Sequence, residues 1–452
     1  MYLGEHMKKF WSIFTAVLIC LGMTALLGAA YHILWGNEQP TVSADSAPPD
    51  ALFCVSASPY YTPTATKHGY NALTTEDQQD VYRAIVRRIT SITDEPTGDK
   101  YTNSSGYFME RIFAPRLNPR ELAMVISCVR EDYPEAFWLT GNCRHGTDEN
   151  GRYFIQLISF LSPAELDGSI QTFNANIAEM IGSLPRGLRE FDREMYVHDW
   201  LLENCQYEDK GYDSDKNDLY TGSAYGAFVG GETICEGYAR GFQLLLKLAG
   251  IESVLVTGSS VPPLGGEGRA HIWNVVRIDG RWYQTDVTWN DSQGAKNAQD
   301  YLNLTTEQMT ADHKFDPLFD EAGSQSPDAQ EYDASYNRPY PDCTSTEMNY
   351  YIQRGVSVRD KTQAAMDQLT RALVKAYHEN LPAVPVIFPA PETAEDCRKW
   401  VTQHAFFRSA RDANLALGEK VYLEKEVYYV RSGTLGNVLI FKPPFREEPD
   451  EG

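Results

Sequence analysis

Hydrophobic residues recur every three or four positions along several stretches of the chain, and this spacing predicts amphipathic helices. The predicted helices cover residues 75–89, 118–129, 166–184, 190–205, 235–249, 366–377 and 393–400, with a short helix before Asp312. Apolar runs typical of strands occupy residues 153–160, 270–278, 281–287, 301–304, 383–388, 421–430 and 437–441. Both kinds of element contribute throughout, and we expect an α+β fold.

The segment of residues 232–291 contains a Cys, a His and an Asp in three different local settings. Gly230–Gly231 interrupts what precedes, apolar residues recur at helical spacing over residues 238–249, and Gly250 stands at the expected C-terminal cap. Cys235 is therefore predicted in the first turn of this helix. Unpaired N–H groups and the helix dipole favour an anion there, and the thiolate is the reactive form of cysteine.

The His and the Asp lie on a predicted hairpin formed by residues 270–278 and 281–287. Asp279–Gly280 between them favours a two-residue type I′ turn, which fixes the register of the two strands. In that register His271 and Asp286 are diagonal neighbours on one face, within reach of each other. The three residues can therefore serve as nucleophile, base and orienting carboxylate.

These motifs resemble those of the transglutaminase-like superfamily, whose papain-like thiol enzymes carry Cys, His and Asp in this order. The matching residues are Cys235-Glu236-Gly237-Tyr238-Ala239, His271 with Trp273-Asn274-Val275, and Trp282-Tyr283 leading to Asp286-Val287-Thr288-Trp289. The resemblance covers residues 190–315 and implies a papain-like/transglutaminase-like core, in which the helix carrying Cys235 packs on an antiparallel sheet. Animal transglutaminases usually have Trp directly after the Cys, where this chain has Glu236, so the resemblance is closer to bacterial members.

Other residues near the three motifs are candidates for supporting roles. Tyr225 is a candidate donor to an oxyanion, and Trp273 and Trp289 are candidates for substrate or oxyanion contact. His198 shares the apolar face of its helix, which favours a structural role in the core. His313 follows the short predicted helix and can help to shape a pocket.

A thiol enzyme of this kind acts on peptide or protein amide bonds through a Cys thioester. Water as the acceptor gives a peptidase or amidase, and a lysine amine gives a cross-linking acyltransferase; the residues leave this choice open. The alternative is a cell-surface module of the same fold that binds a peptide or protein without turning it over. A structural ectodomain held by disulfides is a third possibility.

Residues 10–35 form a nearly uninterrupted apolar run of membrane-spanning length, preceded by Lys8 and Lys9. We expect an uncleaved anchor, with residues 1–9 as a cytoplasmic tail and the rest at the cell surface. The alternative is a signal peptide cleaved near Ala30, which would give a secreted protein.

The remaining chain is predicted to form five regions. They are a linker at residues 36–70, a mixed α/β region at 71–189, the catalytic domain at 190–315, a second linker at 316–348 and a small α+β module at 349–446. In the last, Pro385 is expected to place its strand at a sheet edge, and residues 421–430 and 437–441 to form a closing hairpin.

The net charge of −22 argues against a nucleic-acid partner and fits a neutral or cationic peptide substrate. Six cysteines besides Cys20 and Cys235 either form up to three disulfides or stay free: Cys54, Cys128, Cys143, Cys205, Cys343 and Cys397. None belongs to a Cys-x-x-Cys pair, and Gly230–Gly231 before Cys235 lacks the Lys-Ser/Thr of a phosphate loop. We therefore expect neither a metal nor a cofactor; the oligomeric state is not predicted.

Overall fold

The computed structural model describes residues 58–60, 67–98, 106–208, 220–261, 268–292, 299–315, 340–379, 381, 384–389, 391–418, 421–423, 438–441 and 445–447. These residues belong to one compact unit, Pro49–Gly452. The predicted tail at residues 1–9, the predicted membrane segment at 10–35 and Cys54 lie outside the described residues. Among the helices that are described, none is both long and apolar enough to cross a membrane.

A five-stranded antiparallel sheet lies in the N-terminal region. Its order is β1 (Ile92–Pro96), β2 (Tyr107–Met109), β5 (Tyr153–Ser159) and β3 (Ile112–Phe113), with β4 (Leu139–Thr147) also paired to β5. The predicted strand at residues 153–160 is confirmed as β5. The other four were not predicted, because they are short or, like β4, alternate polar residues with few apolar ones.

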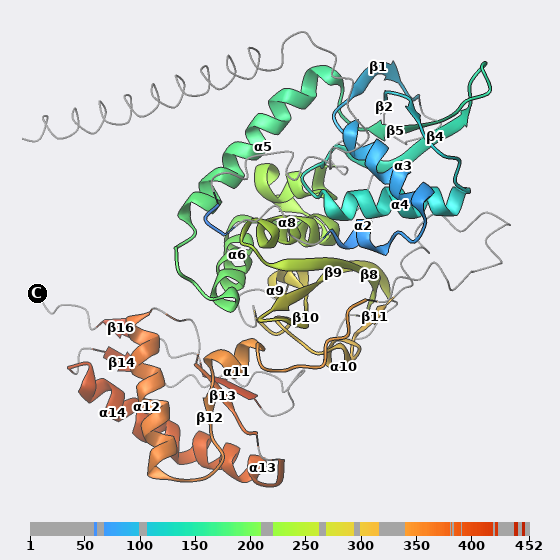
Figure 1. The fold of residues 1–452 in the computed structure, drawn as a ribbon. Helices are drawn as coiled ribbons and strands as arrows, with labels where there is room; N and C mark the ends of the chain where they lie inside the picture. Colours follow the sequence, from blue (N-terminus) through green and yellow to red (C-terminus); the bar gives the residue numbers. More distant parts are fainter. Residues whose placement is uncertain are drawn as a thin grey trace, which may run out of the picture. The chain divides into compact units, whose positions relative to one another are not determined.

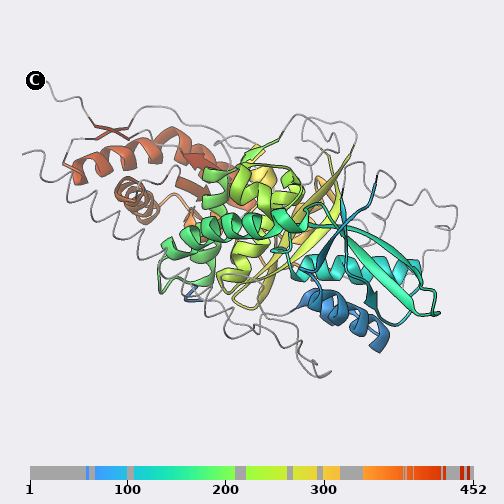
Figure 2. The same cartoon turned by 90° about the horizontal axis from the view of Figure 1, so that it is seen from above.

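Four helices accompany this sheet, α2 (His68–Ala72), α3 (Glu76–Arg87), α4 (Pro119–Asp132) and α5 (Pro163–Ser183), and α6 (Glu190–Asn204) follows them along the chain. Capping boxes begin α3 at Thr75 and α4 at Asn118, close to the predicted starts. Helix α2 begins inside the predicted linker at residues 36–70, because the Asp132 carboxylate accepts the N–H groups of Gly69 and Tyr70, each at 2.8 Å. Figures 1 and 2 show α2, α3 and α4 as neighbours.

The second sheet has four antiparallel strands in the order β10 (Arg281–Thr285), β9 (Arg269–Ile278), β8 (Glu252–Ser260) and β11 (His313–Phe315). The predicted register is confirmed, since Arg281 pairs with Ile278 across the Asp279–Gly280 turn. The predicted strand at 301–304 is wrong. Only Leu304 forms a bridge, to Gln284, and Asn303 has a φ of 60° that interrupts an extended chain.

Helix α8 (Cys235–Leu248) packs against β8 and β9, beside α6 and the short helix α9 (Val287–Ser292) (Figure 1). Its buried face includes Tyr238, Phe242 and Leu245, each fully excluded from solvent. Gly250 ends the helix with a φ of 72°, as predicted for a glycine cap. A helix packed on an antiparallel sheet is the α+β, papain-like core that the sequence predicts.

Several short elements lie between the larger ones along the chain. They are η2 (Gly226–Gly230), the parallel pair β6 (Gln206–Tyr207) and β7 (Glu232–Thr233), and α10 (Thr306–Met309). Residues 316–339 of the predicted second linker lie outside the described residues. Cys343, from the rest of that linker, is only 1% exposed and packs with the core around Trp273, so residues 340–348 are part of the folded unit.

The C-terminal module has its own hydrophobic core. Its elements are α11 (Tyr350–Arg354), β12 (Val356–Ser357), α12 (Gln363–His378), β13 (Val384–Ile387), α13 (Pro391–Trp400), η5 (Val401–Ala405), α14 (Phe406–Ala416), β14 (Val421–Leu423), β15 (Val438–Phe441) and β16 (Phe445–Glu447). Two predictions are wrong here. Strand β13 is central, between β12 and β15, despite Pro385. The predicted closing hairpin is not found among the described residues, because β14 pairs with β16 and β15 pairs with β13.

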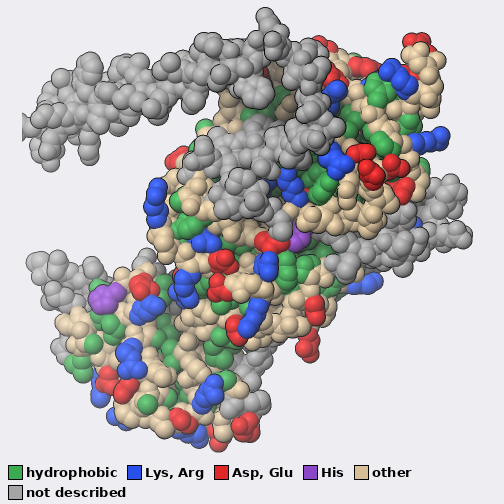
Figure 3. Space-filling view, in the orientation of Figure 1, with side chains coloured by type: hydrophobic (Ala, Val, Ile, Leu, Met, Phe, Trp, Pro, Cys, Tyr) green, Lys and Arg blue, Asp and Glu red, His purple; other side chains and the backbone are tan. Residues whose placement is uncertain are grey.

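Acidic and basic side chains are interspersed over the face of the molecule shown in Figure 3, so the net charge is not gathered in one acidic area there.

Candidate active site

Cys235 is the first residue of α8 and its free thiol is half-buried. The preceding residue, Ile234, gives no side-chain cap, so the N–H groups of the first turn point their positive ends at this position. Gly237 lets the turn approach its neighbours closely, because a Cβ there would meet the Thr233 hydroxyl at 1.8 Å and the Thr221 carbonyl oxygen at 2.4 Å. The structure thus places Cys235 where the sequence predicts it.

His271 extends from β9 and is 6% exposed. Its Nε2 donates to Asp286 Oδ2 at 2.6 Å, and the side chain of Cys235 is close enough to the ring to contribute to its pKa. Burial alone would lower the pKa of His271. The Asp286 charge and hydrogen bond, with a smaller contribution from Cys235, outweigh burial and raise that pKa to about 10.

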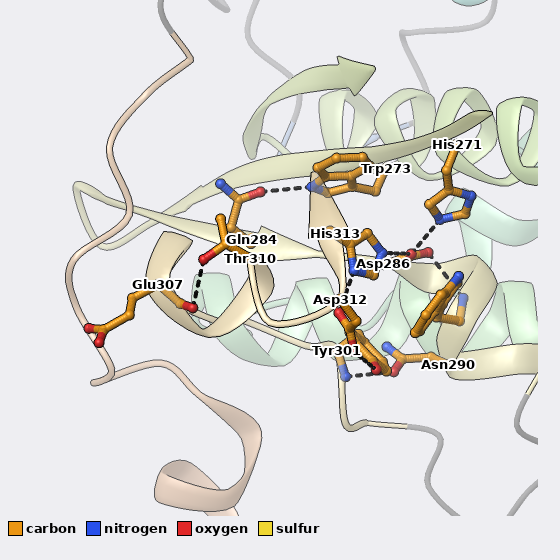
Figure 4. A network of polar contacts seen from close by, with 11 residues as sticks. His271, Trp273, Gln284, Asp286, Asn290, Tyr301, Glu307, Thr310, Asp312 and His313 are labelled. Atoms are coloured by element: carbon orange, nitrogen blue, oxygen red, sulfur yellow. Dashed lines mark hydrogen bonds and ion pairs between the residues drawn. The ribbon is translucent and has the colours of Figure 1, made fainter. Parts of the chain in front are cut away.

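Asp286 lies between β10 and α9 and is fully buried. Its Oδ1 accepts the N–H of Trp289 at 3.0 Å, which ties the carboxylate to the first turn of α9. Its Oδ2 accepts from two imidazoles, those of His271 and His313 (Figure 4). Burial raises the pKa of Asp286, but the charges and hydrogen bonds of the two rings prevail and hold it well below its usual range.

His313 also belongs to this cluster, although the sequence predicts only that it helps to shape a pocket. Its Nε2 lies 2.9 Å from Asp286 Oδ2 and its Nδ1 2.7 Å from Asp312 Oδ1. His271 on β9 and Phe315 on β11 both pair with Gly258 of β8, and the missing side chain leaves room between these strands. A Cβ on Gly258 would meet the Trp273 ring at 2.8 Å.

The three candidates for substrate or oxyanion contact lie in different surroundings. The Trp273 indole donates to Gln284 Oε1 at 2.9 Å and stacks beside His271, so its N–H is already engaged. The Trp289 ring is 8% exposed and tilts against His271 with ring centroids 6.2 Å apart. The Tyr225 ring packs among Phe137, Phe173 and Tyr220, and no described contact joins it to Cys235. Its role as an oxyanion donor stays a prediction.

His198 is fully buried in α6, as its position on the apolar face predicts. Its Nδ1 lies 2.9 Å from Asp199 Oδ1, and its Nε2 lies 2.9 Å from the side-chain amide of Asn290 on α9. Asn290 in turn accepts the N–H of Tyr301 at 2.8 Å. His198 therefore supports the helix that follows Asp286.

Within the described part of the chain, one group of side chains has donor atoms close enough to hold a metal ion: His271, Asp286 and His313, whose atoms lie within 4.8 Å of one another. Separations of 2.6 and 2.9 Å join both ring nitrogens directly to one carboxylate oxygen, so protons occupy the space between them. Metal binding needs deprotonated imidazoles, whereas the pKa of each ring is raised. The donor set fits hydrogen bonding better than a metal.

The other described cysteines are thiols: Cys128, Cys143, Cys205, Cys343 and Cys397. The disulfides allowed by the sequence are therefore not formed among these five. Burial raises the pKa of Cys143 to about 11 and that of Cys205 to about 12, so both thiols stay protonated and unreactive at neutral pH.

Part of the chain is similar to known proteins. The sequence profile of the Transglutaminase-like superfamily matches residues 182–287. The chain is 25% identical to the kyphoscoliosis peptidase of Mus musculus over 134 residues, covering 28% of this chain and 20% of that protein. It is 36% identical to the kyphoscoliosis peptidase of Homo sapiens over 64 residues, 13% of this chain and 10% of that protein.

These matches span a fifth or less of the length of the two relatives. Among solved structures, a TGase is similar at 14% identity and a TM-score of 0.24, covering 44% of this chain and 55% of that one. Residues 182–287 thus match the transglutaminase-like superfamily, the family that the sequence motifs resemble.

Proposed function

We propose that residues 190–315 form the catalytic part of a thiol enzyme that acts on peptide or protein amide bonds. In this proposal Cys235 is the nucleophile, His271 the base and Asp286 the group that orients the ring. One observation carries it: a single buried imidazole hydrogen-bonds a buried carboxylate and interacts with a thiol at a helix start. The match of residues 182–287 to the Transglutaminase-like superfamily supports it.

The first step is transfer of the Cys235 proton to Nδ1 of His271, which gives a thiolate and an imidazolium. Asp286 favours this step, because its buried negative charge stabilises the protonated ring. The start of α8 favours it too, since the positive end of the helix dipole faces the new anion.

The thiolate then attacks the carbonyl carbon of the amide, forming a C–S bond and an oxyanion. The backbone N–H of Cys235 is the first proposed donor to that oxyanion, and the Tyr225 hydroxyl the second. Collapse of the intermediate breaks the C–N bond while His271 gives its proton to the leaving amine. The product of this half-reaction is a thioester on Cys235.

Hydrolysis of the thioester by water is the outcome that we favour, because the two curated relatives are named peptidases. Transfer to a lysine amine is the second candidate, which the likeness to the transglutaminase-like family supports. Binding without turnover is the remaining alternative. An intact Cys235–His271–Asp286 set favours catalysis over it.

The decisive experiment is mass spectrometry of a peptide library after incubation with the protein, with and without a primary amine. Hydrolysed peptides support a peptidase, amine adducts support an acyltransferase, and unchanged peptides that remain bound support a binding module. Cys235→Ala should abolish either reaction without unfolding the chain. Cys143→Ala, which removes a thiol elsewhere, is the matched control and should keep full activity.

Export is a separate part of the proposal and depends on residues 10–35. We propose that they anchor the protein in a membrane, with the catalytic part at the cell surface, and that secretion after cleavage near Ala30 is the alternative. Extraction of the full chain with alkaline carbonate separates the two. Retention in the membrane pellet supports the anchor, and a shortened soluble protein supports cleavage.

A further inference from the structure

His313 takes no part in the steps proposed above, yet it binds the same carboxylate oxygen as His271. Its Nε2 lies 2.9 Å from Asp286 Oδ2, and its Nδ1 lies 2.7 Å from Asp312 Oδ1. Both nitrogens face carboxylates, and both can donate only when the ring is protonated. The geometry thus holds His313 as a buried imidazolium between two aspartates.

Aromatic rings enclose this imidazole, which is 2% exposed. Its ring centroid lies 4.6 Å from that of Trp289, 5.0 Å from that of Trp273 and 5.6 Å from that of Tyr301. Aromatic faces stabilise a neighbouring cation. Burial lowers the pKa of His313, but its hydrogen bonds to Asp286 and Asp312 and the charge of Asp286 outweigh burial and raise it.

Among the described residues, four titratable groups face His313, from β9, the start of α9, the turn before β11 and the loop before α10: His271, Asp286, Asp312 and Tyr301. Its strand partner on β8, Ser260, does not titrate. The Tyr301 hydroxyl donates to Asp312 Oδ2 at 2.6 Å, which fixes the outer carboxylate. Once His271 has taken the Cys235 proton, the two carboxylates and the two protonated imidazoles balance in charge.

We propose that His313 is a positioning residue that fixes the Asp286 carboxylate and limits how tightly His271 holds its proton. The proposal rests on the proposed function, because it gives His313 a role within the set of Cys235, His271 and Asp286. The carboxylate oxygen is shared between two N–H donors, so neither ring has its full basicity. The charge of His313 also opposes that of His271, whose ring centroid is 5.4 Å away.

This sharing matters for the second half of the proposed step. His271 must release its Nδ1 proton to the leaving amine, and a lone, fully desolvated carboxylate on Nε2 would make the ring too basic for that release. With His313 in place, Asp286 still orients the ring through the 2.6 Å hydrogen bond. A residue that only fills space would leave the titration of His271 unchanged.

The test is the titration of His271 by NMR in the full chain labelled with ¹³Cε1-histidine, with the resonance assigned by its loss in His271→Gln. His313→Leu removes both donors and the charge, and His313→Gln keeps an N–H near the position of Nε2 without the charge. The exposed His404 on η5 provides the control, His404→Leu. Thermal unfolding identifies the variants that remain folded, and His313→Gln keeps the test available if the leucine variant does not fold.

We expect His313→Leu to raise the pKa of His271 by about one unit, His313→Gln to raise it less, and His404→Leu to leave it unchanged. An unchanged or lowered pKa of His271 in the folded His313 variants would overturn the proposal. Iodoacetamide labelling of Cys235 in the same samples tests the proposed function separately from the role of His313. An inert Cys235 in the wild-type protein contradicts the proposed function, while the titration still decides what His313 does to His271.

Discussion

Two fully buried carboxyl groups, those of Asp286 and Glu194, lie near the end of strand β10, one on each face of that strand. Neighbouring residues of a strand point to opposite faces, so Thr285 turns towards Glu194 on α6 while Asp286 turns towards His271. Glu194 Oε2 accepts from the side-chain amide of Asn303 at 2.6 Å, and Thr285 lies close enough to influence its pKa. Asp286 has two imidazoles instead.

The difference shows what decides whether a buried acid stays charged. Burial disfavours the anion at both positions, and hydrogen bonds favour it at both. Asn303 and Thr285 cannot become cations, so burial wins and raises the pKa of Glu194 to about 8. The imidazoles can, so Asp286 stays ionised. The ionised Asp286 is on the side of the candidate nucleophile, and the neutral Glu194 is on the side of the core.

The largest expected effect comes from removing the charge at Asp286. Asp286→Asn should lower turnover by roughly 10²–10⁴-fold, because the imidazolium of His271 loses its counter-charge. It should also lower the free energy of unfolding by about 3–5 kcal/mol, since two buried cations lose their partner. Turnover of a peptide identified from the library and urea unfolding measure the two effects.

Glu194→Gln is the matched variant on the neutral side. It should leave turnover within about twofold of the wild-type value, because Glu194 is already uncharged at neutral pH. If Asp286→Asn behaved like Glu194→Gln in both assays, the contrast between the two sides would be refuted.

A smaller effect on stability is expected from Glu194→Gln as the pH rises. The folded pKa of Glu194, about 8, lies above the unfolded value of about 4.3, so stability is lost as the pH rises from about 4.3 to 8. The variant should remove this loss and be more stable than the wild type at pH 9, by an amount on the order of a few kcal/mol.

The variant should keep the further decline between about pH 6.5 and 10 that comes from His271, whose folded pKa is raised to about 10. Urea unfolding from pH 5 to 10 measures both declines. Parallel stability curves for the wild type and Glu194→Gln would show that Glu194 is ionised at neutral pH.

Much of the candidate site was predictable because its signals are local. The start of α8 follows from helical spacing and the Gly250 cap, and the diagonal of His271 and Asp286 follows from the Asp279–Gly280 turn. Each needs only neighbouring residues. Helix starts and two-residue turns are therefore the parts of this site that the sequence specifies most directly.

The neighbours of Asp286 were not predictable in the same way. His313 reaches it because β11 pairs with β8, and strand β8 was not predicted. Glu194 comes from a helix more than 90 residues upstream of Asp286. Strand β13 was misplaced for a related reason, since Pro385 excludes one hydrogen bond but does not set the strand order. Pairing between distant segments leaves no repeating pattern in the sequence from which it could be predicted.

The central claim is that Cys235, His271 and Asp286 act as one unit, and the rate of iodoacetamide alkylation of Cys235 at pH 6 tests it most directly. The thiolate is the reactive form, so a thiol paired with an imidazolium reacts where a free thiol is almost wholly protonated. We predict alkylation at least about tenfold faster than that of glutathione, falling to the glutathione rate in His271→Ala. A wild-type rate equal to that of glutathione, unchanged in His271→Ala, would contradict the claim.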